Sequence, residues 1–180
     1  DIKLYLRAEI QTIAESTYAL FELLQQKSEE YKDCILPGYT HLQLAMPSSF
    51  GLWFGAYAES LVDDLIMLES AYSIVNKNPL GSAAGYGSSF PIDRTLTTKL
   101  LGFDNLNYNV VYAQMGRGKA ERITAMALAN VADTLSKLSM DATTWRTLRV
   151  LKDLGISRKE RVRVGDIEVS PRDLGARLLE

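Results

Sequence analysis

The stretch from Pro47 to Asn76, PSSFGLWFGAYAESLVDDLIMLESAYSIVN, decides the fold, because it is long and has no internal proline. Proline suits the first turn of a helix, and Ser48 and Ser49 offer side-chain oxygens to its first N–H groups. Apolar residues then recur at helical spacing. This stripe consists of Trp53, Tyr57, Leu61, Leu65, Leu68, Tyr72 and Val75. The pattern predicts one helix that ends near Asn76.

The same helix is apolar on more than one side. Its off-stripe apolar residues are Leu52, Phe54, Val62, Ile66 and Met67. A helix that is apolar nearly all round must be covered on several sides. Because this chain offers too few covering partners, we expect other subunits to supply them.

Two further long helices are predicted, over residues 2–32 and roughly 118–142, and a short one starts at Asp93 and ends at Gly102. A helix of about 30 residues spans ~45 Å at 1.5 Å per residue, which is too long for an ordinary globule. The sequence therefore predicts an all-α fold, an elongated bundle of long helices. Residues 33–46, 77–90 and 103–112 are expected to be connecting segments.

The character of the chain changes at Thr143, where arginine and lysine become dense. A helix is predicted from Trp145 to Leu154. Valine and isoleucine alternate with charged residues over 162–164 and 167–169, around Gly165-Asp166, which predicts a β-hairpin, and a short helix follows Ser170-Pro171. We expect residues 1–142 to form a helical central domain and residues 143–180 a small basic appendage or a discontinuous segment.

Composition narrows the functional classes. The net charge of −2 argues against nucleic acid or an anionic membrane as the main partner. No apolar run reaches the ~18 residues of a membrane span. The single cysteine, Cys34, cannot form an internal disulfide, which favours a reducing cytoplasm, and we interpret it as a buried small hydrophobic side chain. One histidine and one cysteine offer no ligand cluster at zinc spacing, so we predict no metal site.

The only histidine, His41, lies in LPGYTHLQ, residues 36–43, between two long helical patterns. Imidazole has the side-chain pKa nearest to neutral pH and exchanges a proton there without large tuning. Thr40 and Gln43 add a hydroxyl and an amide beside it. From the residues alone, His41 is either an acid/base group or a hydrogen-bonded side chain at a helix junction.

Three segments carry a resemblance to a known family. Gly38-Tyr39-Thr40-His41-Leu42-Gln43 resembles the histidine motif of the argininosuccinate lyase family, within the fumarase/aspartase superfamily. NPLGSAAG, residues 78–85, and FPIDR, residues 90–94, resemble the glycine-rich stretch and the following helix start of that family. The resemblance runs from Asp1 to about Ala142.

The resemblance implies a reaction and a set of roles. The family releases fumarate from argininosuccinate by anti elimination, leaving arginine, and needs no cofactor. By resemblance, His41 is the acid/base candidate and Thr40 orients the substrate or a water molecule. Gln43 is expected to hold a substrate carboxylate or to order His41, and Ser82 to lie in a loop near the substrate carboxylates. The resemblance also implies a homotetramer whose active sites draw residues from three subunits.

The sequence departs from the family pattern in three places. The Arg-Asn-Asp-Gln motif is not among these residues, nor is the flexible serine loop that would follow Ala142. The stretch Gln114–Lys119, QMGRGK, stands where the family usually has a Ser-Asp-Arg-Asp-like sequence. We therefore expect this chain to be an incomplete lyase. Two alternatives stay open: a lyase for an acylated argininosuccinate or another N-substituted aspartate, and a non-catalytic helical assembly module like the related lens crystallins.

Overall fold

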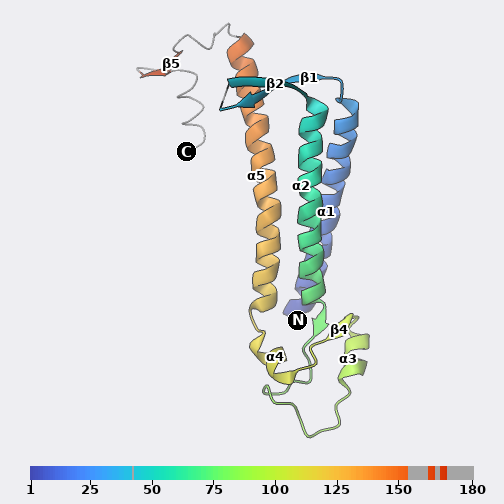
Figure 1. The fold of residues 1–180 in the computed structure, drawn as a ribbon. Helices are drawn as coiled ribbons and strands as arrows, with labels where there is room; N and C mark the ends of the chain where they lie inside the picture. Colours follow the sequence, from blue (N-terminus) through green and yellow to red (C-terminus); the bar gives the residue numbers. More distant parts are fainter. Residues whose placement is uncertain (42, 154–161, 165–166, 170–180) are drawn as a thin grey trace. The chain divides into compact units, whose positions relative to one another are not determined.

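The computed structural model describes residues 1–41, 43–153, 162–164 and 167–169 (Figure 1). The helices are α1 (Ile2–Glu30), α2 (Phe50–Val75), α3 (Arg94–Leu100), α4 (Val110–Met115) and α5 (Lys119–Asp153). The strands are β1 (Ile35–Thr40), β2 (Gln43–Ser49), β3 (Lys77–Asn78), β4 (Asn105–Leu106), β5 (Val162–Val164) and β6 (Ile167–Val169). The predicted all-α class, with long helices, is confirmed.

The chain divides into two compact units. The first comprises residues 1–26 and 56–134, and the second comprises residues 27–55 and 135–180. The predicted division into residues 1–142 and 143–180 stays a prediction.

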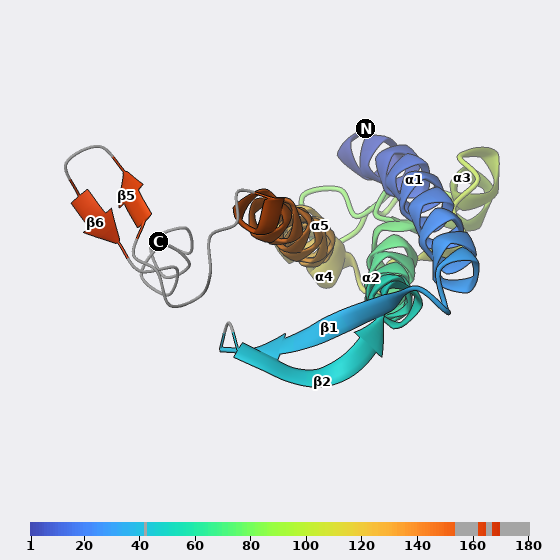
Figure 2. The ribbon, with the colours of Figure 1, turned by 90° about the horizontal axis from the view of Figure 1, so that it is seen from above.

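The core of the first unit lies between segments of α1, α2 and α5, which run side by side in both views (Figures 1 and 2). Its buried residues are Ile10, Leu68, Ala71, Val75, Ala120, Ala127 and Val131. Small alanine side chains let α5 approach the other helices closely. The hydroxyls of Ser60 on α2 and Thr134 on α5 lie 3.3 Å apart and add a polar contact between these helices.

The second unit contains the junction between α1 and α2. The first N–H groups of a helix have no partner inside the helix. In α2, the Phe50 N–H donates to the Cys34 carbonyl and the Gly51 N–H to the Tyr31 carbonyl, each at 3.0 Å. The residues just after α1 thus cap the start of α2. The sequence pattern does not predict this cap, because it depends on contacts between separate segments.

Residues 33–49 differ from the prediction. Residues 33–46 were expected to be a connecting segment and Pro47–Ser49 the start of a helix, but β1 and β2 pair as an antiparallel hairpin, with an irregular register between Gly38 and Tyr39. Pro37 pairs opposite Pro47, so α2 begins at Phe50 and Pro47 belongs to β2. In a two-stranded sheet each strand is an edge strand, so some of its N–H groups face away from the partner strand. Proline, which lacks an N–H, is tolerated at such positions, and both prolines therefore fit within strands.

Two other local predictions were wrong. Cys34, which we interpreted as a buried side chain, is exposed in the turn after α1. The break predicted after residue 142 is absent, and α5 continues to Asp153, because no proline or glycine lies between its ends.

The predicted hairpin near the end of the chain is confirmed. Strands β5 and β6 pair antiparallel, with Val162 opposite Val169 and Val164 opposite Ile167. The helix predicted after Ser170-Pro171 lies outside the described residues.

Candidate functional site

The β1–β2 hairpin brings three predicted site residues together. Thr40 and Gln43 form its last pair, so His41 begins the connection at the tip. All three residues are exposed. The hairpin therefore presents a hydroxyl, an imidazole and an amide within four consecutive residues.

The backbone of His41 is unusual. Its φ is 50°, in the left-handed region, where non-glycine residues are uncommon but histidine is enriched. A residue held there costs free energy of order 1–3 kcal/mol, and such residues cluster at functional sites. The turn thus fixes the direction in which the imidazole leaves the hairpin.

The second candidate segment is the glycine-rich loop that contains Ser82. The Ser82 carbonyl accepts the N–H groups of Gly85 and Gly87, each at 3.0 Å. Four residues of this loop have positive φ, namely Gly81, Ala83, Gly85 and Gly87. Among the described residues, the hydroxyl of Ser82 has no hydrogen-bond partner, and its residue is half-buried. This tight turn leaves the hydroxyl available to a ligand.

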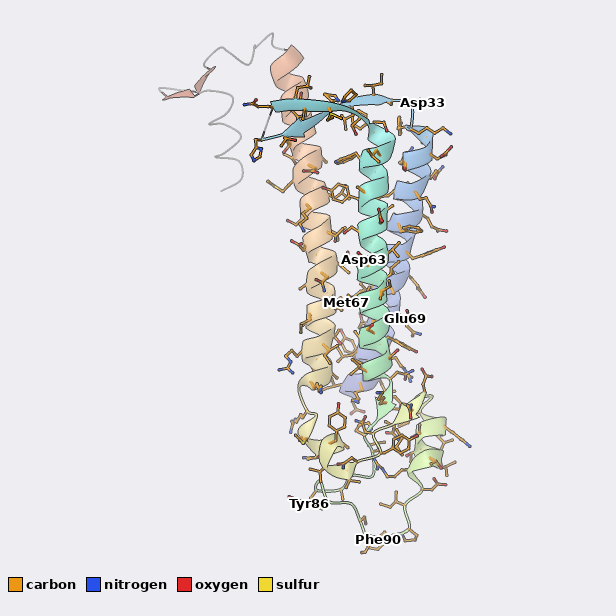
Figure 3. The ribbon with its side chains drawn as sticks, in the orientation of Figure 1. Asp33, Asp63, Met67, Glu69, Tyr86 and Phe90 are labelled. Carbon is orange, nitrogen blue, oxygen red and sulfur yellow. The ribbon has the colours of Figure 1, made fainter. Side chains whose placement is uncertain are left out.

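Farther along the same loop the surface is aromatic. Figure 3 labels Tyr86 and Phe90, which are 88% and 77% exposed.

Asn78, just before the loop, is fully buried. Its amide nitrogen donates to the hydroxyls of Thr97, at 3.2 Å, and Thr98, at 2.9 Å. Its amide oxygen accepts the N–H of Leu80 at 3.0 Å. Asn78 therefore ties the start of the loop to α3.

Arg94, at the start of α3, bonds the same loop at a second point. It donates to the carbonyls of Leu80 at 2.7 Å, Asn107 at 2.8 Å and Tyr108 at 3.2 Å. We assigned no role to Asn78 or Arg94 from the sequence, although both lie in the segments that carry the family resemblance. The only local signals were the Asn-Pro pair and the arginine next to the helix-capping Asp93.

A cavity of about 860 Å³ lies in the first unit, lined by the loop from Asn78 to Ala83 and by parts of α1, α4 and α5. Its charged lining residues are Asp1, Lys3, Arg117, Lys119 and Glu121. Burial lowers the pKa of Lys3, with a further contribution from repulsion by Lys77. Lys119 lies over the ring of Tyr112, 5.5 Å from its centroid. The cavity is large enough for a small molecule and mixes both signs of charge.

The Gln114–Lys119 stretch forms the end of α4 and the turn into α5. Gln114, Arg117 and Lys119 all line the cavity, so this departure from the family pattern lies at the cavity wall.

Ser82 belongs to the first unit, whereas Thr40, His41 and Gln43 belong to the second. The structure thus brings three of the four predicted site residues together and assigns the fourth to another unit. Within the described part of the chain, no group of three or more His, Cys, Asp or Glu side chains is arranged to hold a metal ion. None of the helices described there has both the length and the apolar character to cross a bilayer.

Relatives with assigned names support the resemblance to argininosuccinate lyase. The chain is 67% identical over 142 residues to the argininosuccinate lyase of Bacteroides fragilis and 65% identical over 142 residues to that of Phocaeicola vulgatus. Each match covers 79% of this chain and 32% of the relative, so the chain spans about a third of the length of these curated relatives.

A solved structure, EDDS lyase in complex with formate, superposes with a TM-score of 0.77 at 28% sequence identity. That match covers 81% of this chain and 29% of the EDDS lyase chain. A family model described as Lyase matches residues 1–147, a range that includes both candidate segments. The chain belongs to this lyase family.

Proposed function

We propose that the protein containing this chain releases fumarate from argininosuccinate and leaves arginine. The observation that carries the proposal is the 67% identity, over 142 residues, to an enzyme named argininosuccinate lyase. The family match over residues 1–147 includes Thr40, His41, Gln43 and Ser82.

The elimination breaks a carbon–nitrogen bond and forms the double bond of fumarate. A base removes a proton from the carbon next to a carboxylate, and an acid protonates the leaving guanidine nitrogen. We assign His41 as an acid/base group in these proton transfers, because its imidazole is exposed at the hairpin tip and histidine is the side chain that most often serves as a general acid or base.

The other three residues bind and orient in this proposal. Thr40, next to His41, orients the substrate or a water molecule. Gln43 holds a substrate carboxylate or orders the imidazole. Ser82 contributes to carboxylate binding from the glycine-rich loop. Stabilisation of the charge that develops on the carboxylate is expected to be the largest contribution to catalysis.

We further propose a cytoplasmic homotetramer with shared active sites and no cofactor. Exposed apolar side chains of α2 support the assembly. Leu52 and Ile66, both on α2, are 69% and 54% exposed in the single chain. Val62 and Met67, also on α2, are 40% and 42% exposed. The single cysteine supports the reducing compartment.

The deciding experiment measures fumarate by ultraviolet absorbance, with protein from the complete gene, on argininosuccinate and on its acylated form. Release from argininosuccinate supports the proposal. Release only from the acylated substrate assigns the enzyme to an N-substituted aspartate. A folded tetramer that releases fumarate from neither substrate favours the non-catalytic assembly module.

A further inference from the structure

We propose that Arg94 and Asn78 are positioning residues, which hold the backbone of Leu80 so that Ser82 is placed to bind the substrate carboxylate. The inference rests on the proposed function and adds to it two residues that do not themselves touch the substrate. The bonds that carry this role surround Leu80, two residues before Ser82.

Both polar backbone groups of Leu80 are bonded by side chains. Its N–H donates to the amide oxygen of Asn78 at 3.0 Å, and its carbonyl accepts from Nε of Arg94 at 2.7 Å. A loop residue normally leaves such groups to water. The first bond holds the Pro79–Leu80 peptide and the second holds the Leu80–Gly81 peptide, so together they restrict rotation of both peptide planes that flank Leu80.

Arg94 joins the loop to a second segment. Its two terminal nitrogens donate to the carbonyls of Asn107 and Tyr108, at 2.8 and 3.2 Å. The planar guanidinium presents several N–H donors in a fixed fork, which a lysine ammonium does not reproduce. Arg94 therefore fixes the distance between the Ser82 loop and the segment before α4.

Gly81 lets the loop lie directly on the stem of Arg94. A Cβ atom on Gly81 would lie 2.7 Å from Cγ of Arg94, and the φ of Gly81 is 81°, which side chains rarely adopt. The residue between Leu80 and Ser82 is thus in close contact with the arginine that bonds Leu80. Movement of Arg94 would be transmitted directly to the backbone of Ser82.

Asn78 is an independent anchor on the same segment. It is fully buried, its amide nitrogen is used twice, by Thr97 and Thr98, and its carbonyl accepts the N–H of Asn107 at 2.9 Å. A buried amide with its bonds satisfied holds one rotamer, since any other leaves polar groups unpaired. Asn78 and Arg94 therefore fix Leu80 relative to α3 and to Asn107.

The charge of Arg94 also suits an anionic substrate. Among the described residues its hydrogen bonds go to carbonyl groups, and no carboxylate forms an ion pair with it. Its positive charge thus stays outside any ion pair and lies on the residue that bonds Leu80, two positions before Ser82, where it favours an anionic substrate.

The test compares Arg94→Lys with Arg122→Lys in the full-length protein. Both variants keep the charge, but Arg122 is exposed on α5 and lies outside the proposed machinery. We expect Arg94→Lys to raise KM for argininosuccinate about tenfold with kcat within about twofold, the signature of lost binding that the ground state and the transition state share equally. Arg122→Lys should change neither constant. A purely structural role would lower the active fraction, hence kcat, and leave KM unchanged, and that result would overturn the proposal.

Gly81→Ala gives an independent test should Arg94→Lys fail to fold. The added carbon would press on Cγ of Arg94, so KM should rise here as well, and an unchanged KM would overturn the proposal. Where both variants fold, their combined effect on KM should be less than additive, because they disturb one contact.

Failure of the proposed function is recognised separately, because the wild-type protein would then release no fumarate. In that case amide hydrogen exchange tests whether Arg94 holds the loop. The amides of Gly85 and Gly87, bonded to the Ser82 carbonyl, should exchange faster in Arg94→Lys than in Arg122→Lys. Equal exchange rates would show that Arg94 does not hold the loop.

Discussion

The hydroxyl of Ser28, near the end of α1, donates to the carbonyl of Gly51, in the first turn of α2, at 2.7 Å. The two backbones approach so closely that a Cβ on Gly51 would lie 2.5 Å from the Ser28 carbonyl oxygen and 2.5 Å from Cα of Lys32. This contact supports the base of the hairpin that carries His41.

Gly51→Ala should therefore destabilise the protein by about 1–3 kcal/mol, the usual cost of overpacking. Helix propensity alone would predict the opposite sign, since alanine is favoured over glycine by about 1 kcal/mol inside a helix. Gly55→Ala is the matched control, because the added carbon there meets only the Ser28 hydroxyl, at 3.1 Å. Denaturant titration measures the free energy of unfolding of both variants. An equal loss of stability in Gly51→Ala and Gly55→Ala would contradict the close approach at Gly51.

His41→Asn should lower kcat for fumarate release by roughly 10²–10⁴, as expected for loss of a general acid/base group. Asparagine tolerates the left-handed backbone of His41, so the hairpin should be retained. Steady-state kinetics and circular dichroism on the full-length protein test this. An unchanged turnover would assign His41 a structural role.

The cap of α3 should depend on pH. The pKa of Asp93 is lowered by the hydrogen bond from the Thr95 hydroxyl and then by the Leu96 N–H. A depressed pKa in the folded state means that the stabilisation is present above the ordinary aspartate pKa and is lost as pH falls through the lowered value.

The measurement is thermal unfolding of wild type and Asp93→Asn, from neutral pH down to about pH 2. Any extra thermal stability of the wild type over Asp93→Asn should be largest near neutral pH and should shrink in acid. A difference that stays constant over this range would show that ionisation of Asp93 does not stabilise the cap.

Arg7→Met should destabilise the first unit by about 1–3 kcal/mol, because it leaves acceptors without donors. Arg7 donates to Asn76 Oδ1 at 3.0 Å and to the carbonyls of Gly102 at 2.6 Å and Leu101 at 3.2 Å. It also lies over the ring of Phe103, 5.0 Å from the centroid. Urea titration measures the free energy of unfolding. The control Arg122→Met, on the exposed surface, should change it by no more than about 0.5 kcal/mol.

Ile66→Asp should weaken the proposed tetramer. Ile66 is 54% exposed in the single chain, and its neighbour Met67, labelled on α2 in Figure 3, is 42% exposed. A carboxylate buried in a subunit interface without a partner costs several kcal/mol. Light scattering should show a lower mass for Ile66→Asp and no change for Ile66→Val. Retention of the tetramer by Ile66→Asp would place the interface elsewhere.

The long helices could be read from the sequence because their signal is local. Apolar spacing predicted residues 2–32 and a helix from near Pro47 to Asn76, and the structure has Ile2–Glu30 and Phe50–Val75. The β5 and β6 strands were also predicted with their observed bounds, since alternation over three residues on each side of a turn is a local pattern too.

Strand pairing between distant or irregular segments was not readable. Proline and glycine in residues 33–49 mark a break in a helix, and they do so equally for a loop and for a hairpin. The parallel pairing of Lys77–Asn78 with Asn105–Leu106 joins segments far apart in the chain. Neither two-residue segment has a sequence pattern that predicts a strand.

For the site, the sequence by itself determined which residues are the candidates, because the histidine motif and the glycine-rich loop are contiguous stretches. Only the tertiary structure decided how they are held. The hydrogen bond from Arg94 to Leu80 joins residues fourteen positions apart, and the one from Ser28 to Gly51 spans twenty-three. Such contacts depend on how helices and loops pack against one another, and no local pattern of residue types specifies that packing.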